Sequence, residues 1–275
     1  MVIGLGGINL AGNTAYLAKE TVPSAKKLSS EYYSSALRMT YGISWLAEII
    51  SHLSLDSKDV VNIDPNLSLQ AENIEDFLSN LGLYGGKFEK NVSEFLELIQ
   101  NDEGEKFEKG ISRLGEFLGF ESERPIGDGV PDGIWILSDL IWAFEAKSEE
   151  NKEHSISISA CRQALGHKDW IKHKKELKKE QDVNVTILSH KDKIHTEAVP
   201  HGQDLFHLEV DKVRDLSLKI TQVLRKIRSM ISKENGSTLQ TKEYICQIIE
   251  QENLTYRDIV ELLKDIRVSE MEKGN

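Results

Sequence analysis

The segment that most constrains the fold is a pair of apolar runs separated by a short turn. Residues 127–148 read GDGVPDGIWILSDLIWAFEAKS, and the two runs are IWI and IWAF. Both are made of the β-branched, aromatic and other apolar residues that favour buried strands. The LSDL between them is typical of a hairpin turn. We therefore expect two buried strands that lie side by side as a hairpin.

Charged residues stand at one end of this expected hairpin. Pro131 and Asp132 begin the first run, and Glu145-Ala146-Lys147 ends the second. Folding the hairpin brings Asp132 near that end of the partner strand. Glu145 and Lys147 are two residues apart, so their side chains leave the same face of the strand. The sequence therefore predicts that two carboxylates and an ammonium group converge at the rim of a hydrophobic sheet.

This combination resembles the motif of the PD-(D/E)xK nuclease superfamily, which has the restriction-endonuclease-like fold. The motif is Pro-Asp, a spacer, and an acid-x-Lys after an apolar strand, as in Pro131-Asp132 and Glu145-Ala146-Lys147. An acid-x-Lys triplet alone is common in charged chains and could be an ordinary strand end. The preceding Pro-Asp and the two strands give the triplet its weight here.

The resemblance implies a nuclease that binds Mg²⁺ or Mn²⁺ through Asp132, Glu145 and the carbonyl of Ala146. Carboxylate oxygens are hard ligands that suit these cations. Such a cation polarises the scissile phosphoryl oxygen and lowers the pKa of a bound water. Lys147 would orient or deprotonate that water, or stabilise charge that develops on the phosphate.

A helix expected just before the hairpin supplies another candidate. Residues 107–120 read FEKGISRLGEFLGF, in which apolar residues recur at helical spacing until about Gly119. In many superfamily members a helix of this form carries a Glu that faces the metal. Glu108 is the matching position, and Glu116 is the alternative on the same helix. A solvated glutamate on the helix face is the competing interpretation of Glu108.

The helix expected after the hairpin contains Gln163. RecB-type members of the superfamily carry Gln-x-x-x-Tyr on this helix, whereas this chain has Gln163-Ala-Leu-Gly-His167, with His in place of Tyr. Gln163 is a candidate for holding the attacking water or a phosphate, and the alternative is a surface amide. The His leaves the subfamily open. Because the histidines of this region lack the paired spacing of metal ligands, we expect all of them to be scattered surface residues.

Positive charge is concentrated on the same helix. The net charge of −11 argues against general coating of nucleic acid, because phosphate binding draws on Lys and Arg. Residues 162–179, however, hold seven basic side chains against two acidic ones. The candidates for contacts with a phosphate backbone are Arg162, Lys172, Lys175 and Lys179. A solvated face is the competing interpretation. Trp170 and Leu177 are expected to face the sheet.

The order of helical and strand patterns divides the chain into three. We expect a helical N-terminal region at 1–100, a nuclease core at 101–233, and a linker with short helices at 234–275. The core has a helix, the hairpin, a helix, the strands VNVTILS and LFHLEV, and a closing helix. This order fits an α/β fold with the restriction-endonuclease-like αβββαβ core.

Composition limits the cellular setting. No apolar run approaches the roughly 20 residues that span a bilayer, and 39% of the residues are hydrophobic, as in globular proteins. The two cysteines, Cys161 and Cys246, lie far apart, which argues against zinc fingers and a disulfide framework. We expect a cytoplasmic protein that does not bind membranes.

Together these features indicate a metal-dependent nuclease that hydrolyses phosphodiester bonds in DNA. By analogy, it would serve anti-phage defence or DNA processing. The resemblance favours DNA over RNA, and a nuclease acting on RNA or tRNA stays an alternative. A second alternative is a catalytically silent nuclease fold that binds a helicase, another ATPase or nucleic acid. The helical N-terminal region is a candidate surface for such a partner protein or for a homodimer.

Overall fold

The computed structural model describes residues 64–81, 85–175, 182–231 and 238–274, with a few residues before position 64. The chain forms two compact units, one of residues 1–64 and 235–243, the other of residues 65–234 and 244–275. The second unit contains all the candidate residues and is described by itself below. It includes the helices at 65–99 and the C-terminal segment from residue 244 as well as the core. Almost all of 1–63 lies outside the described residues.

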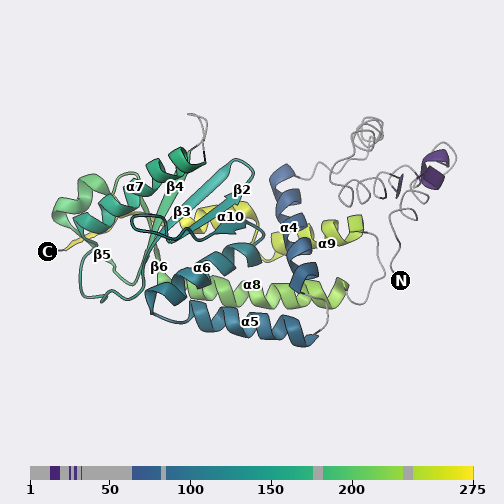
Figure 1. The fold of residues 1–275 in the computed structure, drawn as a ribbon, viewed down its shortest axis with the longest axis horizontal. Helices are drawn as coiled ribbons and strands as arrows, with labels where there is room; N and C mark the ends of the chain where they lie inside the picture. The colour runs from purple at the N-terminus through teal and green to yellow at the C-terminus, as the bar shows by residue number, and fades with distance from the viewer. Residues whose placement is uncertain are drawn as a thin grey trace. The chain divides into compact units, whose positions relative to one another are not determined.

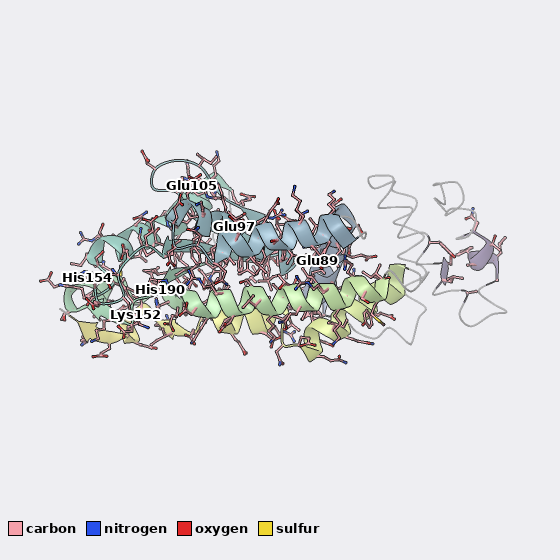
Figure 2. The ribbon with its side chains drawn as sticks, turned by 90° about the horizontal axis from the view of Figure 1, so that it is seen from below. Glu89, Glu97, Glu105, Lys152, His154 and His190 are labelled. Atoms are coloured by element: carbon pink, nitrogen blue, oxygen red, sulfur yellow. The ribbon has the colours of Figure 1, made fainter. Side chains whose placement is uncertain are left out.

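The second unit has a mixed α/β architecture, which confirms the expected fold class at that level (Figure 1). The helices are α4 Pro65–Leu81, α5 Gly85–Ile99, α6 Gly104–Phe117, α7 Ile158–Lys174, α8 Val210–Ile231, α9 Thr238–Gln251 and α10 Tyr256–Leu263, with short 3₁₀ turns η1 Thr196–His201 and η2 Val268–Glu270. Figure 2 shows α5 beside α8, where Glu89 accepts a hydrogen bond from Arg225 at 2.8 Å. None of the described helices has both the length and the apolar character needed to cross a bilayer.

The sheet is mixed, and its strands stand in the order β1-β2-β3-β4-β6-β7. They are β1 Glu121–Glu123, β2 Gly133–Leu137, β3 Leu140–Lys147, β4 Val183–Ser189, β6 Phe206–Glu209 and β7 Ile266–Arg267. Strands β3, β4 and β6 run parallel, and the other neighbours are antiparallel. A separate parallel pair joins β5 Lys193–His195 to β8 Glu272–Gly274.

The hairpin expected from the two apolar runs is confirmed. Trp135 of β2 stands opposite Trp142 of β3 in an antiparallel register. At the turn, Ser138 has a φ of 56°, the left-handed conformation that tight hairpin turns use. From α6 to β4 the elements follow the order helix, three strands, helix, strand.

Helix α7 covers the sheet face that carries Ile134, Ile141 and Ala143. Its buried side chains are Ala160, Cys161, Ala164, His167 and Ile171. Trp170 is partly buried and packs against this core, in line with the expectation that it would face the sheet, while Leu177 lies outside the described residues. The inner face is made largely of small residues, so it has little of the apolar bulk by which a buried face is usually recognised.

Helix α6 packs on the opposite face of the sheet. The Trp135 indole N–H donates to the carbonyl of Ile111 at 3.0 Å. A Cβ atom at Gly115 would lie 2.5 Å from the same indole, so this helix can approach the strand so closely only with glycine there. The contact fixes the distance between α6 and the end of β2 at which Asp132 stands.

The segment after α8 contains more elements than the sequence indicates. The two expected C-terminal helices are present as α9 and α10. Strands β7 and β8 were not expected, because each is only two or three residues long. Val268 and Met271, which lie between these strands, are buried in the core beneath α7.

Candidate functional site

The open end of the β2–β3 hairpin brings Asp132 close to Glu145. Gly133 pairs with Phe144, and the backbone N–H of the preceding residue, Asp132, donates to the carbonyl of Phe144 at 3.0 Å, next to Glu145 on β3. The Asp132 carboxylate accepts the backbone N–H of Ala146 at 2.7 Å. The side chain thereby extends the hydrogen bonding of the hairpin beyond its last backbone pair. The predicted approach of Asp132 to the acid-x-Lys end is confirmed.

Lys147 adds a positive charge beside the two carboxylates. Its Nζ lies 2.5 Å from Oε1 of Glu145. The Glu145 side chain is fully buried, whereas that of Lys147 is 23% exposed. Burial lowers the pKa of Lys147, but the hydrogen bond to Glu145 and its charge outweigh this effect, and the pKa is raised above its ordinary value. The side chain therefore stays an ammonium group.

The carboxyl group of Asp132 is buried close to the carboxylate of Glu145, and its pKa is raised. Burial first, and then the negative charge of Glu145, raise the pKa of Asp132 to about 6. The N–H of Ala146 and the charge of Lys147 oppose the rise without cancelling it. A divalent cation between the two carboxylates would relieve this repulsion, so the donors fit Mg²⁺ or Mn²⁺ in chemistry and charge.

Of the two glutamates proposed on α6, Glu108 is the one that acts on Asp132. Its negative charge contributes to the raised pKa of Asp132. Its Oε2 also accepts hydrogen bonds from Arg124, at 2.6 Å from Nη2 and 3.1 Å from Nε. Glu116 instead pairs with Arg113 at 2.9 Å, on its own helix. Glu108 thus adds a third carboxylate to the electrostatics of the site.

His167 is a site residue that we did not expect. Its Nε2 lies 2.6 Å from Oε2 of Glu145, and both side chains are fully buried. The expectation of surface histidines is therefore wrong for His167, and also for His207, which is 5% exposed. Position 167 falls on the face of α7 that carries Ala164 and Ile171, at spacings of three and four residues. That spacing is the signal that could have found it.

His207 is buried at a neighbouring strand end but takes no part in the carboxylate site. It lies on β6, and its Nε2 is 3.1 Å from the hydroxyl oxygen of Ser189 at the end of β4. Desolvation lowers the pKa of His207. We interpret this pair as part of the packing between the two parallel strands.

The structure does not bring Gln163 into this cluster. Gln163 is exposed on α7, one turn before His167, and within the described residues it makes no hydrogen bond to the carboxylates. A role for Gln163 therefore depends on substrate that approaches from the solvent side.

The basic side chains of α7 have different surroundings. Lys172 is exposed, and Arg162 is exposed with its Nη2 3.4 Å from Nε2 of His201. Lys175, just after the helix, pairs with Glu123 at 2.7 Å. Lys179 lies outside the described residues. Lys172 and Arg162 are thus the exposed members of the proposed phosphate-binding set.

Metal ligation here would use few side chains. In the described parts of the chain, no group of three or more His, Cys, Asp or Glu side chains is arranged to hold a metal ion. The ligand set implied by the resemblance has only two such side chains, Asp132 and Glu145, and its third ligand is the backbone carbonyl of Ala146. Both Glu145 oxygens are engaged, so ligation through Oε1 requires Lys147 to move aside.

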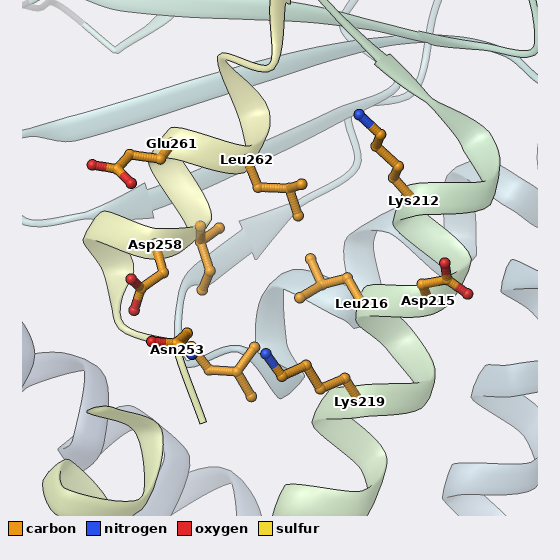
Figure 3. A pocket seen from close by; sticks show the side chains of 10 residues that line it. Lys212, Asp215, Leu216, Lys219, Asn253, Asp258, Glu261 and Leu262 are labelled. Carbon is orange, nitrogen blue, oxygen red and sulfur yellow. The ribbon is translucent and has the colours of Figure 1, made fainter. Parts of the chain in front are cut away.

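A groove of about 380 Å³ lies elsewhere, between α8 on one side and α10 with the residues just before it on the other. Figure 3 shows Leu216 and Leu262 projecting into it from the two sides, with Lys212 and Lys219 along α8. The residues that line it are Lys212, Asp215, Leu216, Lys219, Asn253, Leu254, Asp258, Ile259, Glu261 and Leu262. None of the proposed site residues is among them.

Comparison of the sequence with models of known protein families and with curated proteins found no match. A functional hypothesis for this chain therefore rests on its own motif and geometry.

Proposed function

We propose that the protein is a metal-dependent nuclease that hydrolyses phosphodiester bonds, with DNA as its substrate. The observation that carries the proposal is the placement of Asp132 close to Glu145, with Lys147 in contact with Glu145, at the open end of the β2–β3 hairpin. This arrangement is typical of the PD-(D/E)xK superfamily. The order of elements from α6 to β4 supports the restriction-endonuclease-like core. A cytoplasmic role in phage defence or DNA processing is part of the proposal by analogy.

The residues divide the chemistry between them. Mg²⁺ or Mn²⁺ held by Asp132, Glu145 and the Ala146 carbonyl would polarise the scissile phosphoryl oxygen and lower the pKa of the attacking water. Asp132 presents its carboxylate in a fixed orientation, because the N–H of Ala146 holds one of its oxygens. Lys147 has a raised pKa, so it suits orienting the water or stabilising charge on the phosphate better than removing a proton.

The nucleic acid would approach along the outer face of α7. Arg162 and Lys172 are exposed on this helix, whose buried face packs on the sheet close to Glu145. Because the whole chain carries a net charge of −11, contact with phosphates would be confined to this local basic surface.

One observation favours a second candidate, a nuclease fold without catalytic activity that binds a helicase, another ATPase or nucleic acid. Both oxygens of Glu145 are already engaged, by Lys147 and by His167. A site that stayed closed in this way would keep its charges paired and turn over no substrate.

Cleavage assays on the full chain separate these candidates. Labelled DNA, RNA and tRNA are incubated with Mg²⁺, with Mn²⁺ and with EDTA, and Asp132→Ala serves as the control for contaminating nucleases. We expect cleavage of DNA that depends on the cation and is lost in the variant. Cleavage of RNA or tRNA alone would reassign the substrate. No cleavage of any substrate with either cation would contradict the proposal and favour the silent fold.

A further inference from the structure

The two partners of the Glu145 carboxylate, an ion pair with Lys147 and a hydrogen bond with His167, differ in how freely they can move. Lys147 contacts Oε1 and is 23% exposed, so its flexible side chain can reach solvent. His167 contacts Oε2 and is fully enclosed. A buried carboxylate is costly unless its oxygens are hydrogen-bonded. His167 is therefore the permanent partner of Glu145, and Lys147 is the partner that can leave.

The contact also defines the state of the His167 ring. The partner of Nε2 is a carboxylate oxygen at 2.6 Å, so Nε2 carries a hydrogen and donates it. Nδ1 is buried and has no hydrogen-bond partner among the described residues. The ring is thus held at one point, its contact with Glu145, rather than by a network of its own.

The inner face of α7 makes this contact possible. Ala160, Cys161 and Ala164 are small and fully or almost fully buried against the sheet, so the helix lies close to β3. One turn further along, a side chain of the length of histidine spans the remaining distance to Glu145. An aliphatic residue in that place would leave Oε2 buried without a donor.

We propose that His167 is a positioning residue that holds Oε2 of Glu145 and leaves Oε1 as the single oxygen of that carboxylate available to a divalent cation. The inference rests on the proposed function and deepens it. Glu145 then binds the cation through one oxygen, and Lys147 gives up Oε1 to act on the phosphate or the water. Hydrogen bonds that orient a metal ligand in this way typically change metal affinity by about 10–100-fold when they are removed.

The test compares Mn²⁺ affinity, measured by calorimetry and by electron paramagnetic resonance, in the full chain and three variants. His167→Leu removes the donor, and we expect affinity to fall at least about 10-fold. His167→Gln places an amide N–H close to the position of Nε2, and we expect affinity within about 3-fold of the original. His173→Gln is the matched control, because His173 is exposed on the same helix, and it should change nothing. Equal affinity in the folded Leu variant and the original chain would overturn the inference.

A second measurement, made on the original chain, tests the inference even if His167→Leu does not fold. Nitrogen-15 spectra of the histidines in the original chain should contain a ring N–H at Nε2 of His167 that exchanges slowly with solvent, as its burial beside Glu145 requires. A ring protonated at Nδ1 alone would overturn the inference. If Mn²⁺ binds and the Leu variant binds it more weakly, but no nucleic acid is cleaved, the positioning role stands and the nuclease function falls. If the original chain cleaves DNA and both chains bind Mn²⁺ equally, the nuclease function stands and the positioning role falls.

Discussion

The carboxylate site at the open end of the β2–β3 hairpin, called the rim below, and the groove between α8 and α10 are two contrasting places to look for function. The groove has the volume expected of a small-molecule site, about 380 Å³. Two of its polar groups, Asp258 and Lys212, nevertheless have structural tasks. Asp258 completes the capping box of α10 with the N-cap residue Thr255, whose N–H and hydroxyl donate to its carboxylate at 2.9 and 2.6 Å, and Lys212 pairs with Asp265 at 2.5 Å.

The rim differs because its charges work against one another. Asp132 and Glu145 repel, and the pKa of Asp132 rises to about 6 as a result of burial and that repulsion. No fold needs such a pair for stability, since an apolar or amide residue would fit the same strand end at lower cost. A buried carboxyl group with a shifted pKa is therefore a better guide to the chemistry of this molecule than the presence of a groove.

The largest expected effect is the loss of cleavage when a rim carboxylate is removed, which a groove variant should not show. Asp132→Ala or Glu145→Ala removes a carboxylate ligand, so cleavage should fall by about 10³-fold or more and Mn²⁺ affinity should drop. Asp215→Ala, in the groove, should leave both unchanged. Undiminished turnover in either rim variant, measured on labelled DNA, would end the nuclease interpretation.

Lys147→Ala should lower turnover by about 10²–10³-fold, while DNA affinity stays close to that of the original chain and Mn²⁺ affinity does not fall, because Lys147 no longer occupies Oε1 of Glu145. Its proposed task is performed in the transition state, which a binding measurement does not register. Lys212→Ala supplies the matched groove variant, which should cleave normally. Equal losses of DNA affinity and turnover would make Lys147 a phosphate anchor instead.

Without a divalent cation, the stability of the protein should fall as pH rises from about 4 to 6. The folded pKa of Asp132 is about 6, above its ordinary 3.8, so the folded state binds more protons in this window. Asp132→Asn removes the penalty and should raise the free energy of unfolding at pH 7 by up to about 3 kcal/mol. Asp215→Asn, in the groove, should leave the free energy of unfolding unchanged. Urea unfolding at pH 4 and pH 7 measures both, and a variant no more stable at pH 7 would show that the two carboxylates do not strain the fold.

The smallest expected effect concerns the basic side chains of α7. Replacing Lys172, Lys175 and Lys179 with Gln should weaken DNA binding about equally for every sequence. The log–log dependence of affinity on salt should flatten by roughly 0.9 for each duplex phosphate that the variant no longer neutralises. Because Lys175 also pairs with Glu123, we expect a smaller share from that position. An unchanged slope would show that these lysines are a solvated face of the helix.

The hairpin and the position of Asp132 could be predicted because the information is local. Strand pattern, turn and the two-residue period together fix which side chains share a face. Helical spacing in the same way placed the α6 and α7 helices, whereas the preference for Glu108 over Glu116 came from the family resemblance.

The part that could not be predicted depends on packing between segments distant in the chain. His167 meets Glu145 only because α7 packs closely on the sheet through Ala160 and Ala164. A histidine among lysines in the sequence resembles a solvated residue. Strands β7 and β8 are too short to leave a pattern, and only their partners, β6 and β5, make them strands.

The pairing of β7 with β6 has a consequence for synthesis on the ribosome. Strand β6 ends at Glu209, and its outer partner, β7, begins at Ile266. At about 5–20 residues per second, several seconds pass before that partner is translated. During this interval the edge of β6, with the apolar Phe206 and Leu208, is open to pairing with another nascent chain. Conditions that slow translation of this segment should therefore favour aggregation of the newly made protein, whatever the stability of the finished fold.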